Sequence, residues 1–542
     1  MVIINICRIL ISIAIFSNGG TAYELFSVGC QLELDGNIEE AVEYYKKAIE
    51  LDPHAPQVYL ALANALYRIK RFEEGINYAT EGLSISPDNV ELNEIIAVGY
   101  IGRGDLKRAI HFYEKVLQME SEEIDNYTAL SILYEGTTQL KKARQVLEAM
   151  PSDLKTSAIF TRLGALSGKE NDHGTAIHYY QQAHNLDITN TTALIGIGTG
   201  FDILGVKDSA IYYYEEVLQA DTFNIMVGKR LIDLYSDTEQ YEQVITMGKE
   251  ILAYDYYDGY VRRNMGFAFY KMGLMQAALN QFLITSRIDP QDTYSTFYVG
   301  RIYLEQGNYD AAQNEIIKAI RVNPDFIELW VYLGFIAIDI EDFKTAEYAF
   351  SEAAHRGGDV VQIYYLLGVT AEMQQHYRDA YFYYHKSLSV HSKNLASLEA
   401  LANLCERIDK KGEAFETFHR IIELDTTNTV ALNYVGYTYA ERNENLEYAL
   451  ELIDRALVLE EDNGYYIDSR GWVFYQMGRY EEALVELKKA VDLTADAVIL
   501  EHLGDAYMKL NDVENARDVY EKALERDPEN KTLKKKLQDI NK

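Results

Sequence analysis

The chain has 542 residues, of which 48% are hydrophobic, 44 are tyrosine and only 7 are proline. This composition excludes a disordered or fibrous protein and favours a helical one. Asp and Glu total 84 against 51 Lys and Arg, and the resulting net charge of -33 repels phosphate backbones, so we expect no nucleic-acid partner.

The N-terminal segment is apolar. Residues 1–16 carry a single charged side chain, Arg8, and a short polar stretch ending at Ala22 follows them. This order resembles a secretory signal peptide. We therefore expect residues 1–22 to direct export to the periplasm or cell envelope, with a cytoplasmic protein as the alternative. Membrane association is expected only through this segment, if it stays uncleaved.

From residue 22 onward, small residues recur with a period of 34. Within each unit, apolar residues spaced by three and four predict two helices, at positions 1–14 and 18–31. Positions 8 and 20 are almost always Gly, Ala or Ser, as expected where two helices cross, and position 24 is often aromatic. The units begin at residues 22, 56, 90, 124, 157, 191, 225, 259, 293, 327, 361, 395, 429, 464 and 497.

Two units depart from this pattern. In the seventh unit, Ile232 and Val244 replace the small residues, so we expect a splayed hairpin. In the fourth, Pro151 falls within the second predicted helix, where we expect a bend. The chain thus divides into residues 22–156 with repeats 1–4, residues 157–530 with repeats 5–15, and residues 531–542, a short polar helix that caps the last hairpin.

The unit starting at 293 is among the most regular. Its pattern residues are Gly300, Tyr303, Gly307, Tyr309, Ala312, Ala319 and Pro324. On these residues the chain resembles tetratricopeptide-repeat (TPR) proteins over residues 22–530, and residues 433–505 resemble bacterial members. The resemblance implies an all-α, right-handed superhelical solenoid of about 15 antiparallel helix hairpins with a C-terminal capping helix.

The same resemblance implies a function. It indicates a non-enzymatic scaffold or adaptor that binds partner proteins or peptides in a groove, in complexes of the bacterial cell envelope. The alternative is a cytoplasmic co-chaperone or regulatory sensor that captures one peptide, without export.

Motifs for chemistry are not expected in this chain. The glycines from Gly196 to Gly200 lack the GxGxxG spacing of a dinucleotide loop and fall in a predicted helix, where close helix packing explains them. The 11 histidines include no HExxH pair. We therefore expect no catalytic residues, no cofactor and no metal site.

In the family that the chain resembles, positions 2, 5, 9, 12 and 13 of each first helix line the groove. In the units at 225, 259 and 293 these positions carry basic and aromatic residues, which resembles a carboxylate clamp. Alternatively, Lys229 and Arg263 pair with Asp233, Asp237 or Glu305 and only neutralise charge. The candidate peptide-binding residues are Lys229, Arg263, Phe267, Tyr270, Lys271, Tyr294, Phe297 and Arg301.

A second aromatic surface is predicted near the C-terminus. Aromatic residues anchor many interfaces, so these side chains are candidates for contact with a partner. Packing between repeats is the alternative interpretation. The residues are Tyr437, Tyr465, Trp472 and Tyr475.

Overall fold

The structure is a computed structural model that describes residues 20–120 and 122–540. Apart from a 3-10 turn at Ser152–Leu154, the regular elements of these residues are all α-helices. The chain forms two compact units, Met1–Leu274 and Met275–Lys542. The export segment predicted over residues 1–22 lies, up to residue 19, outside the described residues.

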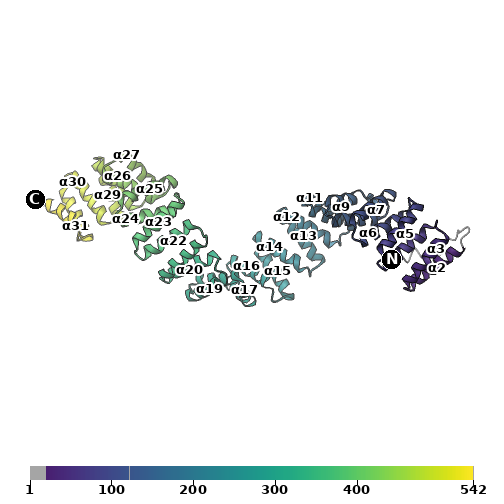
Figure 1. Ribbon diagram of the computed structural model, residues 1–542. Coiled ribbons are helices and arrows are strands. Elements are labelled where there is room, and N and C mark those ends of the chain that lie inside the picture. The colour runs from purple at the N-terminus through teal and green to yellow at the C-terminus, as the bar shows by residue number, and fades with distance from the viewer. Residues whose placement is uncertain (1–19, 121, 541–542) are drawn as a thin grey trace. The chain divides into compact units, whose positions relative to one another are not determined.

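The first unit is a row of antiparallel helix hairpins, each packed against the one before (Figure 1). Within this unit, each first helix from α4 to α16 begins at a predicted unit start. The helices are α2 (Gly20–Leu34), α3 (Ile38–Leu51), α4 (Pro56–Arg68), α5 (Phe72–Ile85), α6 (Val90–Gly102), α7 (Leu106–Met119), α8 (Ile124–Gly136), α9 (Leu140–Glu148), α10 (Ser157–Lys169), α11 (His173–Leu186), α12 (Thr191–Ile203), α13 (Lys207–Ala220), α14 (Ile225–Asp237), α15 (Tyr241–Tyr254) and α16 (Gly259–Lys271).

The second unit continues the same alternation and ends in a single helix. There Leu533 of α32 is buried against the preceding hairpin, which confirms the predicted cap. The helices are α17 (Met275–Ile288), α18 (Thr293–Glu305), α19 (Tyr309–Val322), α20 (Ile327–Asp339), α21 (Phe343–His355), α22 (Val360–Met373), α23 (Tyr377–Val390), α24 (Leu395–Arg407), α25 (Lys411–Leu424), α26 (Thr429–Arg442), α27 (Leu446–Leu459), α28 (Gly464–Gln476), α29 (Tyr480–Leu493), α30 (Ala497–Lys509), α31 (Val513–Arg526) and α32 (Lys531–Ile540).

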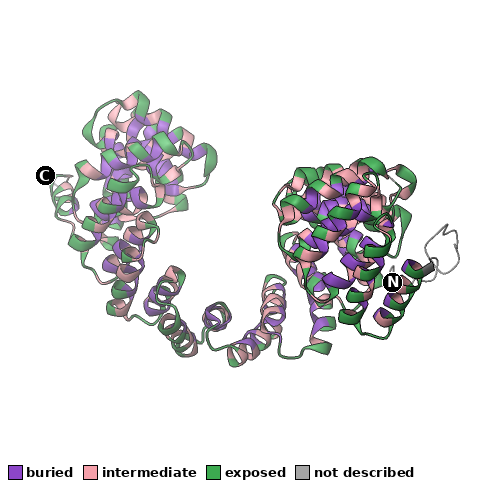
Figure 2. Ribbon diagram, turned by 45° about the vertical axis from the view of Figure 1, so that its right-hand side comes forward, coloured by how far each residue is buried: buried purple, intermediate pink, exposed green. Residues whose placement is uncertain are grey.

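Steric fit explains the small residues at positions 8 and 20. A Cβ atom on Gly368, at position 8, would collide with the ring of Tyr384, at position 24 of the same repeat. Ala380, at position 20, is fully buried beside them. The ring fills the space that the missing side chain leaves, and Figure 2 shows buried residues concentrated between the helices of each unit.

At Pro151 the helical pattern is interrupted. α9 ends at Glu148, a 3-10 turn follows, and α10 begins at Ser157. One hydrophobic cluster nevertheless contains Leu147 before the proline and Leu163 after it. The hairpins therefore keep packing against each other here, and the predicted boundary at 156/157 lies inside the first compact unit.

The seventh repeat keeps helices of ordinary length, but α14 and α15 approach each other less closely than α12 and α13 do. Ile232 and Val244 are fully buried at the positions that hold glycine or alanine elsewhere. Their larger side chains occupy the crossing point, which gives the looser hairpin expected from the sequence.

Candidate functional site

The predicted basic and aromatic residues fall on α14 and α16 in the first unit and on α18 in the second. In the first unit, the ring of Tyr260 lies near two cationic side chains. Lys229 Nζ and the Arg263 guanidinium each lie 5.8 Å from the centre of its ring. Successive repeats thus bring residues 34 positions apart to one aromatic side chain, an arrangement that favours cation–π attraction.

Lys229 also forms an ion pair within the array. Its Nζ lies 2.5 Å from Asp258 Oδ2, and the Asp258 side chain is buried. Asp258 caps α16 by accepting a hydrogen bond from the backbone N–H of Val261. The charge of Lys229 is therefore neutralised, as the alternative interpretation held, but by Asp258 and not by Asp233, Asp237 or Glu305.

The two aspartates of that interpretation have other partners. Asp233 accepts hydrogen bonds from the Tyr260 hydroxyl and from Arg230, and Asp237 pairs with Lys207. Burial, together with the neighbouring Asp233 carboxylate, raises the pKa of Tyr260. Tyr260 therefore stays neutral at physiological pH.

A charge pair that the sequence did not reveal lies next to this group. Arg230 Nε and Nη2 each lie 2.6 Å from an oxygen of Asp202, which forms a bidentate bridge between α14 and α12. The two residues are 28 positions apart, so no local motif predicts the pair. Only their places in consecutive repeats could have indicated that they meet.

The other candidates of the first unit lie on α16. Lys271 Nζ lies 5.3 Å from the centre of the Phe267 ring, one helical turn earlier. Phe267 and Tyr270 are half-buried, whereas Lys271 is exposed. These residues form a mixed aromatic and basic face on this helix.

In the second unit, α18 carries the remaining three candidates. Tyr294 is exposed and its ring centre lies 5.1 Å from that of Phe326. Arg301 pairs with Glu305 at 3.2 Å and lies over the ring of Tyr332. Phe297 is different, because it belongs to the hydrophobic core.

The prediction that Phe297 lines an open groove is wrong. Its side chain is only 6% exposed and packs edge-on against Tyr332. Its ring also lies 5.5 Å from that of Phe326, so it is packed among aromatic side chains of the following repeat.

Three of the four predicted C-terminal aromatic residues gather with His502 on the first helices α26, α28 and α30. The Trp472 ring lies between Tyr475, at 4.6 Å and 7° between ring planes, and His502, at 4.1 Å and 17°. Tyr437 of α26 lies near the His502 ring. Trp472, Tyr475 and Tyr437 are half-buried, so the stack is partly open to solvent. We call these four residues the Trp472 stack.

A buried acid holds the histidine of this stack. His502 Nδ1 lies 3.0 and 3.1 Å from the two carboxylate oxygens of Asp468, and both side chains are buried. A carboxylate only accepts hydrogen bonds, so Nδ1 carries the proton. The indole Nε1 of Trp472 is buried and has no hydrogen-bond acceptor among the described residues.

Carboxylates surround the stack. Lys536 of the cap helix lies 2.8 Å from Glu501 and 2.6 Å from Asp505. Burial and the nearby Asp505 raise the pKa of Tyr475 to about 12. Tyr465, the fourth predicted aromatic residue, is 56% exposed at the start of α28 and lies outside the stack.

The glycine-rich stretch of α12 serves packing. Cβ atoms on Gly196 and Gly198 would collide with the rings of Tyr180 and Tyr214. Among the described residues, no group of three or more His, Cys, Asp or Glu side chains is arranged to hold a metal ion. The described helices also include none with the length and hydropathy needed to cross a membrane.

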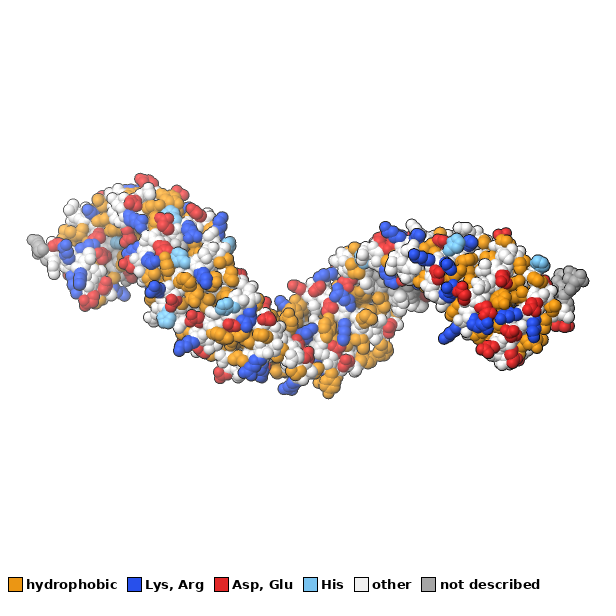
Figure 3. All heavy atoms as spheres, in the orientation of Figure 1, with side chains coloured by type: hydrophobic (Ala, Val, Ile, Leu, Met, Phe, Trp, Pro, Cys, Tyr) orange, Lys and Arg blue, Asp and Glu red, His pale blue; other side chains and the backbone are white. Residues whose placement is uncertain are grey.

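Charged side chains of both signs are interspersed over the visible face of each unit (Figure 3). The repeated hairpins define a helical-repeat protein. Models of the TPR repeat match residues 35–70, and models of the tetratricopeptide repeat match residues 56–89, 299–360, 468–496 and 497–530. The chain belongs to the tetratricopeptide-repeat family.

Individual relatives share limited segments. A TPR repeat-containing protein of Pseudomonas aeruginosa is 29% identical over 120 residues, 22% of this chain and 20% of that protein. Heat shock protein STI1 of Saccharomyces cerevisiae is 27% identical over 123 residues, 22% of this chain and 20% of that protein. A protein O-mannosyl-transferase of Homo sapiens is 26% identical over 189 residues, 34% of this chain and 21% of that protein. The chain thus spans about a fifth of the length of these curated relatives.

Two solved structures align with most of the chain at low sequence identity and low TM-score. The crystal structure of the APC/C hetero-tetramer Cut9–Hcn1 matches 84% of this chain and 97% of its own chain, with 11% identity and a TM-score of 0.31. The structure of Naa15/Naa10 bound to HypK matches 96% of this chain and 99% of its own, with 13% identity and a TM-score of 0.32.

Proposed function

We propose that the chain is a non-enzymatic scaffold that binds a partner protein through the exposed face of its first helices. The observation that carries this proposal is the Trp472 stack. Three half-buried aromatic rings on α26 and α28 are held in place by the buried pair of His502 and Asp468. Rigid, partly exposed Trp and Tyr side chains dominate the energetics of protein interfaces.

The charges around the stack indicate what kind of partner it suits. Glu501 and Asp505 share the cation Lys536, and the chain as a whole carries a net charge of -33. A partner segment with basic side chains would complement these carboxylates, and its aliphatic stems would cover the rings. The proposed partner surface is therefore basic.

A test of this surface uses the full chain as bait in an extract of its native host. We expect Trp472→Ala to lose the specific partner, because truncation removes the centre of the stack. Phe382→Ala is the matched control, since Phe382 is an exposed ring on a second helix, α23. Partner capture that survives Trp472→Ala at the wild-type level would remove this surface from the proposal.

The group around Tyr260 is the second proposed surface, with Arg263, Phe267, Tyr270 and Lys271 in the first unit. Lys229 already pairs with Asp258, so its charge is largely neutralised within the chain, and its main role at this surface is contact with the Tyr260 ring. Arg263→Gln is the informative change, because replacing Lys229 would also disturb a buried carboxylate. We propose that an acidic peptide end binds here, and α18 contributes Tyr294 and Arg301 as further candidates in the second unit.

The match to the O-mannosyl-transferase covers only 21% of that protein. Because the match is this limited, we still propose that the chain has no enzymatic activity. We also propose that no cofactor is required, because a scaffold of this kind works by surface contact alone.

We propose a location in the bacterial cell envelope, supported by the apolar order of residues 1–22 and the resemblance of residues 433–505 to bacterial members. The alternative is a cytoplasmic co-chaperone or regulatory sensor, which the match to heat shock protein STI1 favours. The mass of the mature N-terminus from the native host separates the two. Removal of about 22 residues supports export, and an intact N-terminus supports the alternative.

A further inference from the structure

The fourth residue of the first helix has a recurring role in this array. In three repeats its side chain donates a hydrogen bond to the backbone carbonyl six residues earlier, in the loop before the repeat. Each of these side chains combines a flat body with an N–H or O–H donor. The pairs are Tyr59 with Pro53 (3.3 Å), Arg262 with Tyr256 (2.9 and 2.6 Å), and Trp330 with Pro324 (2.7 Å).

The seventh repeat has no side chain at this position, because residue 228 is glycine. A pocket of about 280 Å³ opens beside Gly228, and Thr222, six residues earlier, is part of its lining. Among the described residues, no side chain donates to the Thr222 carbonyl. The pocket therefore lies where three other repeats place an indole, a phenol or a guanidinium group.

The inner wall of the pocket can accept a larger residue. A Cβ atom on Gly228 would lie 3.2 Å from Ile251 Cδ1 and 3.3 Å from Met247 Sδ. Both atoms are the mobile ends of flexible side chains, so small adjustments relieve the contact.

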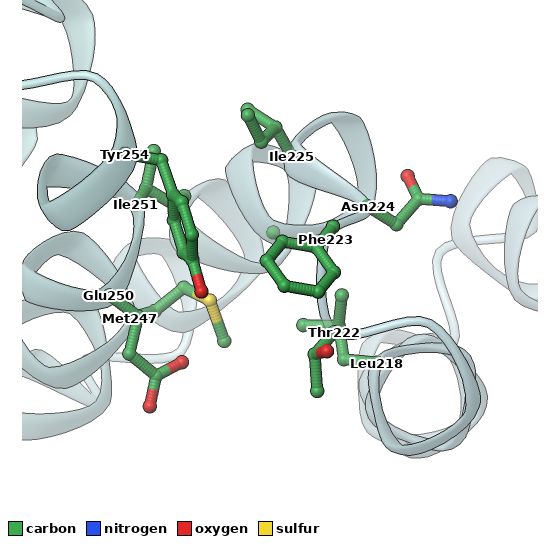
Figure 4. Close-up of a pocket in the computed structure, with 10 residues that line it drawn as sticks. Leu218, Thr222, Phe223, Asn224, Ile225, Met247, Glu250, Ile251 and Tyr254 are labelled. Atoms are coloured by element: carbon green, nitrogen blue, oxygen red, sulfur yellow. The ribbon is translucent and has the colours of Figure 1, made fainter.

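Two aromatic rings form the outer rim. Phe223 and Tyr254 are 64% and 62% exposed, and their ring centres lie 5.1 Å apart at an angle of 74°. Figure 4 shows the two rings side by side, with Glu250 on the side of Tyr254 and Thr222 on the side of Phe223. Large exposed rings around a hollow mark a site for an apolar group.

The charges at the rim are acidic. Glu250 lines the pocket, and Asp221 lies in the same loop as Phe223. A ligand that enters with a basic group beside its apolar part would complement these carboxylates.

We propose that this pocket binds a tryptophan side chain of a partner polypeptide. The indole N–H donates to the Thr222 carbonyl, as Trp330 donates to Pro324 within the chain, and a basic residue next to the tryptophan pairs with Glu250. The site goes beyond the proposed scaffold surfaces, since it occupies position 4 of the repeat rather than the face that carries Tyr260 and the Trp472 stack.

The probe is N-acetyl-5-fluorotryptophanamide, titrated against the full chain and followed by ¹⁹F NMR. A pocket for one side chain gives a Kd on the order of 0.1–1 mM for this probe. The analogue methylated at the indole nitrogen cannot donate, and we expect it to bind roughly three- to tenfold more weakly. Acetyl-Arg-Trp-amide is expected to bind several-fold more tightly than acetyl-Glu-Trp-amide.

Gly228→Trp fills the pocket from within the chain. We expect it to weaken probe binding at least about tenfold while the Tm stays equal or rises. Gly174→Trp is the matched control, because Gly174 is exposed and has open space around it, and this variant should bind like the wild type. Phe223→Ala removes one exposed rim ring and should weaken binding even if Gly228→Trp does not fold.

Three outcomes would overturn the proposal. The first is equal probe binding by the wild type and by Phe223→Ala or folded Gly228→Trp. The second is equal binding of the two indole probes. The third is self-association of the wild-type chain in light scattering that Gly228→Trp abolishes, since the occupant would then be a second copy. Loss of a partner through Trp472→Ala is independent of all three, so failure of this site and failure of the scaffold surface can be told apart.

Discussion

The ring of Trp472 lies on the ring of His502, with centres 4.1 Å apart and planes 17° from parallel. The two residues come from the first helices of consecutive repeats, α28 and α30. Their contact therefore depends on how those repeats stack. Asp468 of α28 holds His502 of α30 through a buried hydrogen bond. The indole therefore stacks on a ring whose position is fixed by buried contacts.

Trp472→Ala should lower stability only moderately. Trp472 is half-buried, so we expect a loss of about 1–2 kcal/mol, below the ~3–5 kcal/mol of a fully buried tryptophan. Urea unfolding monitored by far-UV circular dichroism measures it. A loss above about 4 kcal/mol would show that the stack is core, and the packing interpretation would then replace the binding one.

Gly368→Ala should destabilise the second unit by roughly 1–3 kcal/mol, because the new methyl group collides with the ring of Tyr384. Gly412→Ala is the control, since a Cβ atom there meets nothing within 4 Å. Alanine at that helical position should be neutral or stabilise by up to about 1 kcal/mol. Similar urea midpoints for the two variants would contradict the steric explanation of the small residues.

Glu135 of α8 joins two repeats through ion pairs with Lys169 at 2.5 Å and Arg162 at 2.7 Å of α10. The hydrogen bond from Lys169, opposed by burial and aided by Arg162, lowers the pKa of Glu135. A carboxyl group with a lowered folded-state pKa contributes stability above its unfolded pKa of about 4.3, and this contribution disappears as the pH falls through the folded-state pKa.

Glu135→Gln should therefore cost about 1 kcal/mol at pH 7 and progressively less below about pH 4. Unfolding free energies of the wild type and the variant between pH 3 and pH 8 test this expectation. Glu50→Gln, at an exposed position of α3, is the control and should show little difference at any pH. A Glu135→Gln deficit that grows on acidification would have the wrong sign for this ion pair.

Lys229→Glu should destabilise the first unit more than Lys229→Gln does. The glutamate would place a second carboxylate against the buried Asp258, whereas glutamine can still donate a hydrogen bond. We expect the difference to be about 1–2 kcal/mol at pH 7. Equal urea midpoints for the two variants at pH 7 would mean that the Lys229–Asp258 ion pair does not contribute to stability.

The period of small residues predicted the helices closely because helix crossing tolerates little variation. A side chain on Gly368 has no space, so the sequence shows where each hairpin crosses. The site was harder to predict, because polar partners can come from any nearby loop. Asp258 precedes its repeat as a helix cap, and nothing in the local sequence links it to Lys229.

Two further features could not be predicted from the sequence, for different reasons. Phe297 occupies a predicted groove position, but its side chain is buried in the core against Phe326 and Tyr332. The pocket beside Gly228 arises from a missing side chain, and a glycine in a helix carries no motif. The hydrogen bonds that Tyr59, Arg262 and Trp330 donate at the same repeat position show which side chain is missing at Gly228.

The central claim is that the first helices contact a partner. Photo-cross-linking in the native host tests it most directly, with p-benzoylphenylalanine at Gln476, on first helix α28, or at Val485, an exposed residue of second helix α29. The account predicts a discrete protein adduct from position 476 that Trp472→Ala abolishes, and none from position 485. An adduct from position 485 alone, or one from position 476 that Trp472→Ala leaves unchanged, would contradict it.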